Sequence, residues 1–256
     1  MPRYKLTIEY AGTRYSGWQI QKNARTVQGE IDRAVRSVTG RRDFELYGSG
    51  RTDAGVHALA QVAHLDVATP LPPETLRRRM NDELPADINI LAAAQVPHRF
   101  HARHDAIARR RTAFAKAYVW WVKEPLEVAR MREAARAFVG LRDFRAFAAA
   151  DARDEGEEAR STRVLVDRVE LVEEGELILV AVQGSHFLWK MVRRIVGVLV
   201  EIGRGGLPAE AAAGLFDEDS DAPARLTAPP SGLFLEKVFY KGDSTDVAAR
   251  AVTPIG

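Results

Sequence analysis

Cysteine is absent from the 256-residue sequence, and so is any long apolar run. The absence of cysteine excludes disulfides, thiolate catalysis and cysteine-ligated zinc or iron–sulfur centres, and it points to the cytoplasm. No apolar stretch approaches the roughly 20 residues that a membrane-spanning helix needs. The opening segment 1–6 leads directly into alternating residues and lacks the apolar region of a signal peptide. We therefore expect a cytoplasmic protein without a membrane partner.

A strong net charge is also missing, since the formal charge is only +2. The arginines nevertheless gather in three short runs, at 77–79, 109–111 and 193–194. Such runs can bind phosphates even when acidic residues elsewhere cancel the total charge. Each run can equally be a solvated helix face paired with nearby acids. The hydrophobic fraction of 46% with 28% charged residues is that of a soluble globular protein.

Residue periodicity in the first half predicts the order β-α-β-β-α-β. Alternation of apolar and polar residues indicates the strands, and an apolar stripe at helical spacing indicates the helices. The predicted strands are 4–10, 44–47, 61–67 and 88–96, and the predicted helices are 26–38 and 72–81.

The second half nearly repeats this order. It has predicted helices at 126–139 and 187–202 and predicted strands at 163–172, 176–183 and 233–240. The opening strand of the repeat is missing, because the region from Ala106 to Val122 shows no comparable alternation. The small, charged residues from Ala148 to Ala159 predict a loop.

These patterns predict an α+β fold of two similar β-α-β-β-α-β halves. We expect the halves to share a largely antiparallel sheet with helices on one side and an active-site cleft between them. The predicted division is an N-terminal half at 1–104, a C-terminal half at 105–245 and a tail at 246–256.

One glycine-punctuated segment carries the clearest chemical signal, Gly48-Ser49-Gly50-Arg51-Thr52-Asp53-Ala54-Gly55-Val56-His57. Its glycines permit positive φ angles and a close approach of main chain to a ligand. An arginine two residues before a carboxylate can pair with it or hold a phosphate beside it. Asp53 is either a catalytic carboxylate or the cap of a turn, which is the commoner fate of an aspartate in such a loop. The segment is neither a phosphate-binding loop nor a dinucleotide fingerprint.

Residues 50–57 resemble the signature of the tRNA pseudouridine synthase A family. Further segments resemble that family in the same order along the chain, although Ala11 stands where aspartate is usual. They are Tyr10–Gln19, Thr26–Glu30, Phe100–Arg103, Phe187–Gly197 and Gly232–Leu235.

The resemblance implies a tRNA pseudouridine synthase, with Asp53 as the catalytic nucleophile. In the implied reaction the glycosidic bond of a uridine breaks, the uracil turns, and C5 joins the sugar C1′. The target base must leave its stack before a side chain can reach it. A carboxylate can attack either the base or the sugar carbon. The resemblance further implies tRNA as partner, uridines 38 to 40 of the anticodon stem-loop as targets, a homodimer, no cofactor and no metal.

Four other residues receive roles from the same resemblance. Arg193 is expected to pair with Asp53 and keep it ionised, although it can also be a surface arginine on a helix. Arg51 is expected to hold the flipped nucleotide or fill its vacated place. Leu233 is expected to pack on the target base, although its residue type alone favours a core position. Arg103 is expected to contact the RNA backbone.

The sequence departs from the family at one place. After Phe100–Arg103 the family carries a strand with the pattern Arg-x-Tyr-x-Tyr, whose first tyrosine lines the active site; this pattern is absent here. The departure coincides with the missing strand of the repeat. Either residues are lacking, or Phe114–Val122 provides a replacement strand, or activity is impaired. Tyr118 resembles a later segment and is not given the tyrosine's role.

Two rival functions remain. The chain can be a non-catalytic RNA-binding protein that retains the fold, and pseudouridine formation distinguishes the two. His98, His101 and His104 recur every third residue, which suggests a metal-dependent hydrolase, but Pro97 opposes a regular helix through them and no cysteine supports a metal site. His57 is expected to form structural hydrogen bonds.

Overall fold

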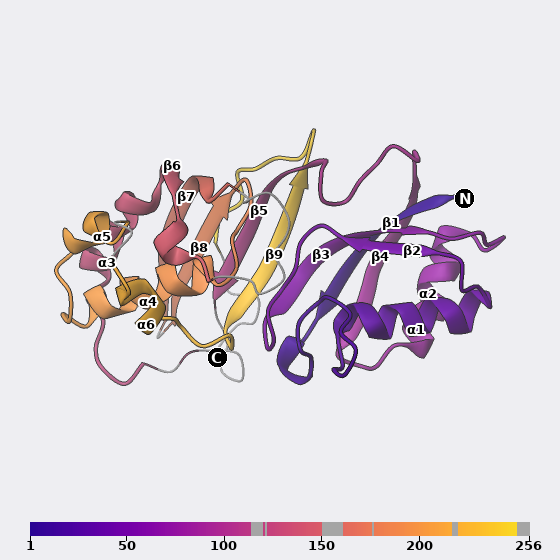
Figure 1. Ribbon diagram of the computed structural model, residues 1–256, viewed down its shortest axis with the longest axis horizontal. Coiled ribbons are helices and arrows are strands. Elements are labelled where there is room, and N and C mark those ends of the chain that lie inside the picture. Colours follow the sequence, from indigo (N-terminus) through magenta and orange to yellow (C-terminus); the bar gives the residue numbers. More distant parts are fainter. Residues whose placement is uncertain (114–119, 121, 150–160, 176, 217–219, 250–256) are drawn as a thin grey trace. The chain divides into compact units, whose positions relative to one another are not determined.

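The computed structural model describes residues 1–113, 120, 122–149, 161–175, 177–216 and 220–249. The chain divides into two compact units (Figure 1). The first comprises Met1–Ile107 with Phe234–Thr245, and the second comprises Ala108–Leu233 with Asp246–Gly256. Within the described residues, no helix combines the length and apolar character needed to cross a bilayer.

The first unit is built on a sheet with the strand order β4-β1-β3-β9, and β2 pairs with β3 beside this path. The pairs are antiparallel except for β3 and β9, which run parallel where His57 faces Phe234. The strands are β1 (Arg3–Tyr10), β2 (Glu45–Gly48), β3 (His57–Asp66), β4 (Ile88–Val96) and β9 (Leu233–Tyr240).

Two helices, α1 (Val27–Thr39) and α2 (Pro73–Glu83), cover one face of this sheet (Figure 1). Every second residue of β1 is buried, as the alternation predicts, and these residues share a core with the apolar stripe of α1. Thr26 caps α1 by accepting the Gly29 N–H, and the left-handed Gly40 ends it. A short 3₁₀ turn, η1 (Gly12–Arg14), follows β1.

The sheet of the second unit has the order β5-β8-β7-β6, with antiparallel pairs where the register is defined. Its strands are β5 (Ala106–Ala113), β6 (Gly140–Asp143), β7 (Arg163–Glu174) and β8 (Leu177–Gly184). Its helical elements are α3 (Val128–Ala135), η2 (Arg136–Phe138), η3 (Arg145–Phe147), α4 (Met191–Gly203), α5 (Ala211–Gly214) and α6 (Ala222–Arg225). The predicted α+β class with a largely antiparallel sheet is therefore confirmed.

The prediction that an opening strand is missing from the second half is wrong, because β5 occupies residues 106–113. The strand escapes recognition because a charged side chain takes an inward position. Arg110 is fully buried and donates to the Glu170 carboxylate at 3.3 Å and to the main-chain carbonyl of Val247. These partners compensate the buried charge, so an arginine stands where the pattern requires an apolar residue. Arg110 is consequently not part of a solvent-facing basic run.

Two smaller differences concern element ends. The helix predicted from Phe187 begins only at Met191, because Lys190 adopts a left-handed conformation with φ 61°. The four residues of β6 were not predicted, since so short a strand gives little alternation. The predicted loop at 148–159 and the proposed replacement strand at 114–122 lie largely outside the described residues.

Candidate active site

The loop that carries Asp53 joins β2 to β3, and its entry is fixed by β3 itself. The Ser49 N–H donates to the Val62 carbonyl at 2.7 Å, and its hydroxyl donates to Gln61 Oε1 at 2.8 Å. Gln61 Nε2 in turn donates to the Gly50 carbonyl at 2.9 Å. Ser49 and Gln61 are both fully buried, so these polar groups are paired away from water.

Thr52, directly before Asp53, is held by two residues of the N-terminal segment. The main-chain N–H of Trp18 donates to the main-chain carbonyl of Thr52 at 3.1 Å. The hydroxyl groups of Tyr10 and Thr52 lie 2.8 Å apart and are hydrogen-bonded. All three residues are buried. The main chain on the N-terminal side of Asp53 is therefore fixed by a packed framework.

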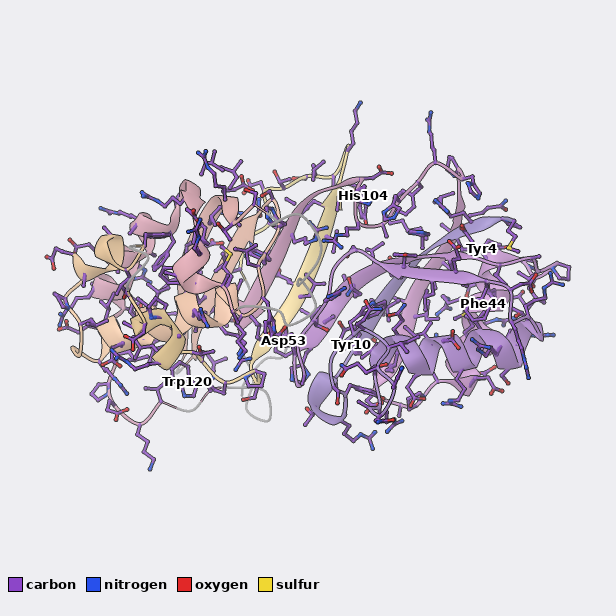
Figure 2. The ribbon with its side chains drawn as sticks, viewed as in Figure 1. Tyr4, Tyr10, Phe44, Asp53, His104 and Trp120 are labelled. Atoms are coloured by element: carbon purple, nitrogen blue, oxygen red, sulfur yellow. The ribbon has the colours of Figure 1, made fainter. Side chains whose placement is uncertain are left out.

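The C-terminal side of Asp53 is a turn closed by main-chain atoms. The Val56 N–H donates to the Asp53 carbonyl at 3.1 Å, and the Gly55 N–H donates to the Tyr15 carbonyl at 3.3 Å. Gly55 has a φ of 78°, which favours glycine. The Asp53 main-chain carbonyl therefore closes the turn. Its side chain, labelled in Figure 2, is partly exposed and follows the buried Thr52.

Two glycines allow the N-terminal segment to approach this loop. A Cβ at Gly12 would lie 1.9 Å from the Val56 carbonyl oxygen, and a Cβ at Gly17 would lie 2.4 Å from that of Thr52. Both distances are far below van der Waals contact, and the atoms met are main-chain atoms that cannot swing aside. The segment 12–18 and the loop thus pack main chain against main chain.

His57 completes the loop as a structural residue. Its Nδ1 accepts the Gly12 N–H at 3.1 Å, which places the proton of the neutral ring on Nε2. The imidazole stacks on the Phe234 ring with centroids 4.8 Å apart. Burial lowers the pKa of His57 to about 4, so the ring is neutral at neutral pH. This geometry supports the structural role expected for it.

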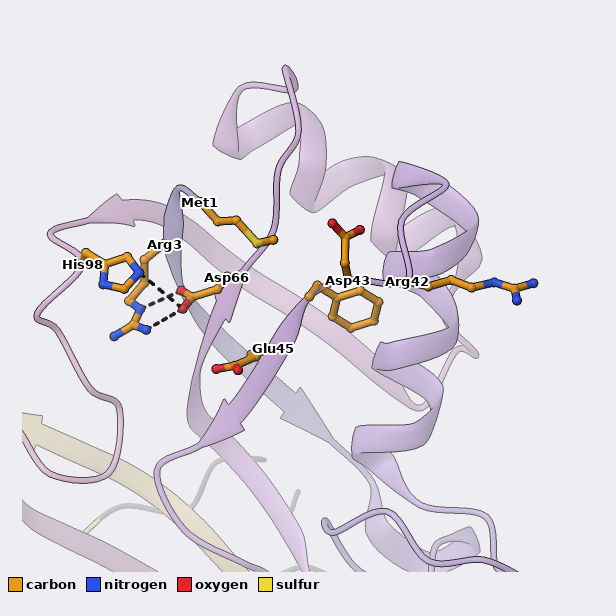
Figure 3. A pocket seen from close by; sticks show the side chains of 8 residues that line it. Met1, Arg3, Arg42, Asp43, Glu45, Asp66 and His98 are labelled. Atoms are coloured by element: carbon orange, nitrogen blue, oxygen red, sulfur yellow. Dashed lines mark hydrogen bonds and ion pairs between the residues drawn. The ribbon is translucent and has the colours of Figure 1, made fainter.

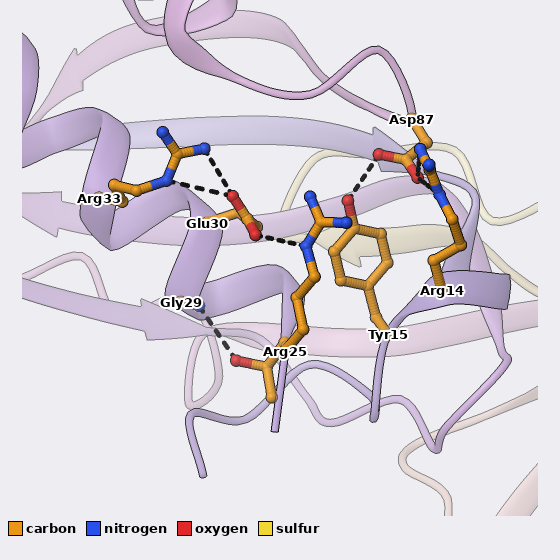
Figure 4. Close-up of polar contacts among 8 residues, drawn as sticks. Arg14, Tyr15, Arg25, Gly29, Glu30, Arg33 and Asp87 are labelled. Carbon is orange, nitrogen blue, oxygen red and sulfur yellow. Dashed lines mark hydrogen bonds and ion pairs between the residues drawn. The ribbon is translucent and has the colours of Figure 1, made fainter. Parts of the chain in front are cut away.

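A polar brace holds the same N-terminal segment from the other side. The Tyr15 hydroxyl donates to one Asp87 carboxylate oxygen at 2.5 Å, and Arg14 Nε donates to the other at 2.8 Å (Figure 4). The Arg25 guanidinium lies 5.1 Å from the centre of the Tyr15 ring and pairs with Glu30 at the start of α1. Burial, assisted by Asp87, raises the pKa of Tyr15. The brace keeps the Tyr15 carbonyl in place for Gly55.

In the second unit, α4 orients two adjacent arginines differently. Arg193 Nε donates to the Ala228 carbonyl at 2.7 Å, and the Ala228 N–H donates back to the Arg193 carbonyl at 3.0 Å. Arg194 donates to the carbonyls of Ala146 and Ala148, and burial lowers its pKa. Arg194 is thus a structural residue, and both arginines are partly exposed in the first turn of the helix.

The remaining predicted site residues have distinct environments. Leu233 is 4% exposed and begins β9 after Gly232, whose φ is 87°. Arg51 is exposed on the loop, two residues before Asp53. Arg103 is exposed in the segment between β4 and β5. The structure thus brings Arg51 and Asp53 together on one loop.

A hollow of about 500 Å³ lies at the opposite end of β3 from this loop (Figure 3). Asp66, in its wall, stands nine residues after His57, about 30 Å along an extended strand. Its carboxylate pairs with Arg3 through two hydrogen bonds. The lining carries charges of both signs and consists of Met1, Arg3, Arg42, Asp43, Phe44, Glu45, Asp66 and His98. The hollow is therefore separate from the loop of Asp53.

The histidines proposed as metal ligands engage one another and the main chain. The rings of His101 and His104 have centroids 4.2 Å apart. His101 Nδ1 accepts the N–H groups of Arg103 and His104, both at 3.2 Å. Across the described residues, no group of three or more histidine, aspartate or glutamate side chains is arranged to hold a metal.

The residues that hold the loop received no role from the sequence. They all lie in the opening segment Tyr10–Gln19, which resembles the family: Tyr10, Gly12, Tyr15 and Trp18. That resemblance is the sequence signal that points to a role for them. Tyr118 lies outside the described residues.

Comparison with known proteins gives a consistent result. The sequence matches the family profile described as tRNA pseudouridine synthase over residues 6–105 and 134–241. It is 40% identical to tRNA pseudouridine synthase A of Geobacter sp. (strain M21), covering 94% of this chain and 99% of the relative. It is also 40% identical to tRNA pseudouridine synthase A of Rhodopseudomonas palustris (strain BisA53), covering 94% of this chain and all of the relative. The chain therefore belongs to the tRNA pseudouridine synthase family.

Proposed function

We propose that the protein isomerises uridine to pseudouridine in tRNA, with Asp53 as the nucleophile. Family membership supports the activity. The position of Asp53 carries the assignment: it is partly exposed on a loop whose main chain is held on both sides by buried hydrogen bonds. A nucleophile must be held in such a fixed position to meet its target at a productive distance.

The chemistry needs no second reactant, because uridine and pseudouridine are isomers. The C1′–N1 bond breaks and a C1′–C5 bond forms; C5 loses a proton and N1 gains one. A carboxylate that adds to the sugar or to the base and then leaves divides this exchange into easier steps. The proposal accordingly includes neither cofactor nor metal.

Asp53 must be ionised to attack, and we assign Arg193 as the cation that keeps it so. The Arg193 Nε–Ala228 hydrogen bond supports this role because it limits the orientations of the guanidinium. A paired guanidinium stabilises the carboxylate form and lowers its pKa. The resemblance of Phe187–Gly197 to the family provides the other support.

The remaining roles follow the same resemblance. Arg51 holds the flipped nucleotide or fills its place, and its exposure on the loop suits either task. Leu233 packs on the target base, and Arg103 contacts the RNA backbone. The targets are uridines 38 to 40 of the anticodon stem-loop, and extrusion of the base from its stack precedes attack.

The finer architecture belongs to the proposal as well. We infer two similar halves that share a sheet and flank the RNA, with Asp53 contributed by one half and Arg193 and Leu233 by the other. We also infer that the protein is a homodimer located in the cytoplasm. Symmetric dimers are the commonest oligomers.

A second candidate is a non-catalytic RNA-binding protein with the same fold. The observation that favours it is the sequence of β5, which contains no tyrosine although the family's pattern places one there. The strand itself is present, so the departure concerns this side chain rather than the sheet.

One experiment separates the two candidates. The protein is incubated with an unmodified tRNA transcript, and pseudouridine is mapped by position, with binding measured in parallel. Pseudouridine at positions 38 to 40, unaffected by a chelator, is the expected result. Binding without product would favour the non-catalytic candidate, and product that disappears with chelator would favour the metal-dependent alternative.

A further inference from the structure

Four rings gather in the first unit, outside the loop of Asp53, and we call them the aromatic patch: Tyr47, His64, His101 and His104. Tyr47 and His64 lie opposite each other on β2 and β3, with rings stacked at 5.6 Å and 8°. His101 meets His64 edge-on at 4.7 Å and lies 5.9 Å from Tyr47. His104, labelled in Figure 2, continues the row at 4.2 Å from His101.

The base of the aromatic patch is fixed by the segment between β4 and β5. His64 is buried, and its Nδ1 accepts the Ala102 N–H at 3.2 Å. The Ala102 carbonyl accepts the Tyr240 hydroxyl at 2.9 Å, and Arg3 donates to the Phe100 carbonyl at 2.6 Å. These contacts hold His101 beside His64, so the patch is preorganised.

The imidazoles of His64 and His101 have lowered pKa values. Burial lowers the pKa of His64 to about 4, and burial together with His104 lowers the pKa of His101. The Nδ1 atoms of both rings accept main-chain N–H groups, an arrangement that protonation of Nδ1 would break. His64 and His101 therefore contribute uncharged π faces to the patch.

The outer part of the patch is open to solvent. Tyr47 is 55% exposed although it is a large aromatic residue, and His104 is exposed as well. Arg103, between His101 and His104 in the sequence, is also exposed. An exposed, preorganised ring with an arginine on the neighbouring segment can bind unpaired nucleotides, because the base stacks on the ring and the phosphate pairs with the cation.

We propose that the aromatic patch is a second RNA-contact site, in which an unpaired tRNA base stacks on Tyr47 and Arg103 contacts a neighbouring phosphate. The inference rests on the proposed function, since it takes tRNA as the ligand. It adds a stacking contact outside the loop that holds Asp53.

The spacing along β3 separates this contact from the reaction. His64 stands seven residues after His57, about 23 Å along an extended strand. Stacked nucleotides advance about 3.4 Å each, so this distance corresponds to about seven steps. A base stacked at the patch and a base beside His57 are therefore different nucleotides.

Fluorescence anisotropy with an unmodified tRNA transcript, measured over a series of KCl concentrations, tests the proposal in the full-length protein. Tyr47→Ala and Tyr47→Leu should each raise Kd about 5-fold or more, while Tyr47→Phe should bind as wild type, because stacking needs the ring and not the hydroxyl. The salt dependence of the Tyr47 variants should match wild type, since no charge is removed. Arg103→Ala should instead lower the slope of log K against log salt by about one phosphate contact.

Leu141→Ala is the matched control, because Leu141 on β6 is 56% exposed, close to the 55% of Tyr47, and is a large hydrophobic residue outside the patch. It should leave Kd unchanged. Equal affinities of Tyr47→Ala and wild type would overturn the proposal, as would restoration of affinity by leucine. A change from dimer to monomer in light scattering, with Kd unaltered, would identify the patch as a contact between copies of the chain and also overturn it. These affinities do not depend on turnover, so a protein that binds tRNA without forming pseudouridine would refute the proposed activity alone.

Discussion

The hydroxyl of Tyr10, the last residue of β1, is hydrogen-bonded at 2.8 Å to the hydroxyl of Thr52, the residue directly before Asp53. Both groups are buried. The contact joins positions 42 residues apart, so the sheet determines where the Asp53 main chain lies. The position of the carboxylate is thus tied to the fold and not to the loop alone.

Removal of this hydrogen bond should affect catalysis more than tRNA binding. Tyr10→Phe leaves the buried Thr52 hydroxyl without this partner and should lower the free energy of unfolding by about 1 kcal/mol. Displacement of Asp53 should lower kcat roughly 10-fold, with Kd for tRNA near wild type. Single-turnover kinetics at saturating tRNA measures the change in rate, and a binding titration measures the Kd for tRNA.

Tyr4→Phe is the control for this prediction. Tyr4 is buried in the same strand and on the same face, six residues before Tyr10. Its substitution should leave kcat unchanged. Equal kcat values for Tyr10→Phe and wild type would show that the hydroxyl contact does not position Asp53.

A methyl group at Gly12 should displace the loop. The added carbon would lie 1.9 Å from the Val56 carbonyl oxygen, so main chain must move. Gly12→Ala should lower the free energy of unfolding by about 2 kcal/mol and lower kcat at least 10-fold. In Gly214→Ala nothing lies within 4 Å of the new carbon, and this helical substitution should be neutral or stabilise by up to about 1 kcal/mol. Urea denaturation and turnover measure both variants; similar effects would refute the close-packing argument.

Mild acid should destabilise the fold through its buried histidines. The pKa values of His57 and His64 are lowered from 6.5 to about 4, so below pH 6.5 the unfolded chain binds more protons than the folded one. Their contribution is fully present above about pH 6.5 and is lost as the pH falls toward 4. Between pH 7 and pH 5 the free energy of unfolding should fall by on the order of 2 to 4 kcal/mol.

Urea titrations at both pH values test this dependence. His57→Gln has one such group fewer and should lose about half as much stability over the same interval. An equal loss in wild type and in His57→Gln would contradict the assignment.

The ion pair of the buried Arg110 should stabilise the fold more than an exposed pair on the same unit. Glu170→Gln weakens the partner of the fully buried Arg110 and should lower the free energy of unfolding by about 1 to 3 kcal/mol. Glu173→Gln removes an exposed pair with Arg132 from the same strand and should cost no more than about 0.5 kcal/mol. The midpoints of denaturant unfolding curves compare the two variants. Equal losses of unfolding free energy would show that the buried Arg110 is not stabilised by Glu170.

Much of the fold follows from local sequence patterns. The strands β4 and β9 have the predicted bounds, because a short run rich in apolar residues is a local signal. β5 could not be predicted in this way, since the residues that compensate Arg110 lie far away in the sequence, at Glu170 and Val247. The late start of α4 depends on a single left-handed residue, Lys190, within an apolar stretch.

The candidate site was likewise predictable only where the sequence carries a local signal. A contiguous signature identifies the loop of Asp53 through resemblance to the family. The contacts that hold it, from Tyr10, Gly12 and Trp18, join separate segments of the chain and have no local signature. Only a folded chain reveals that the turn after Asp53 is closed by main-chain atoms.

Asp53→Asn tests the central claim most directly. The amide preserves the size of the side chain and removes its charge, so the loop should keep its conformation. Pseudouridine in an unmodified tRNA transcript is quantified after prolonged incubation, alongside the Kd for the same RNA. We predict no detectable product with a Kd close to that of wild type. Turnover retained by Asp53→Asn would show that the nucleophile lies elsewhere and would contradict the account.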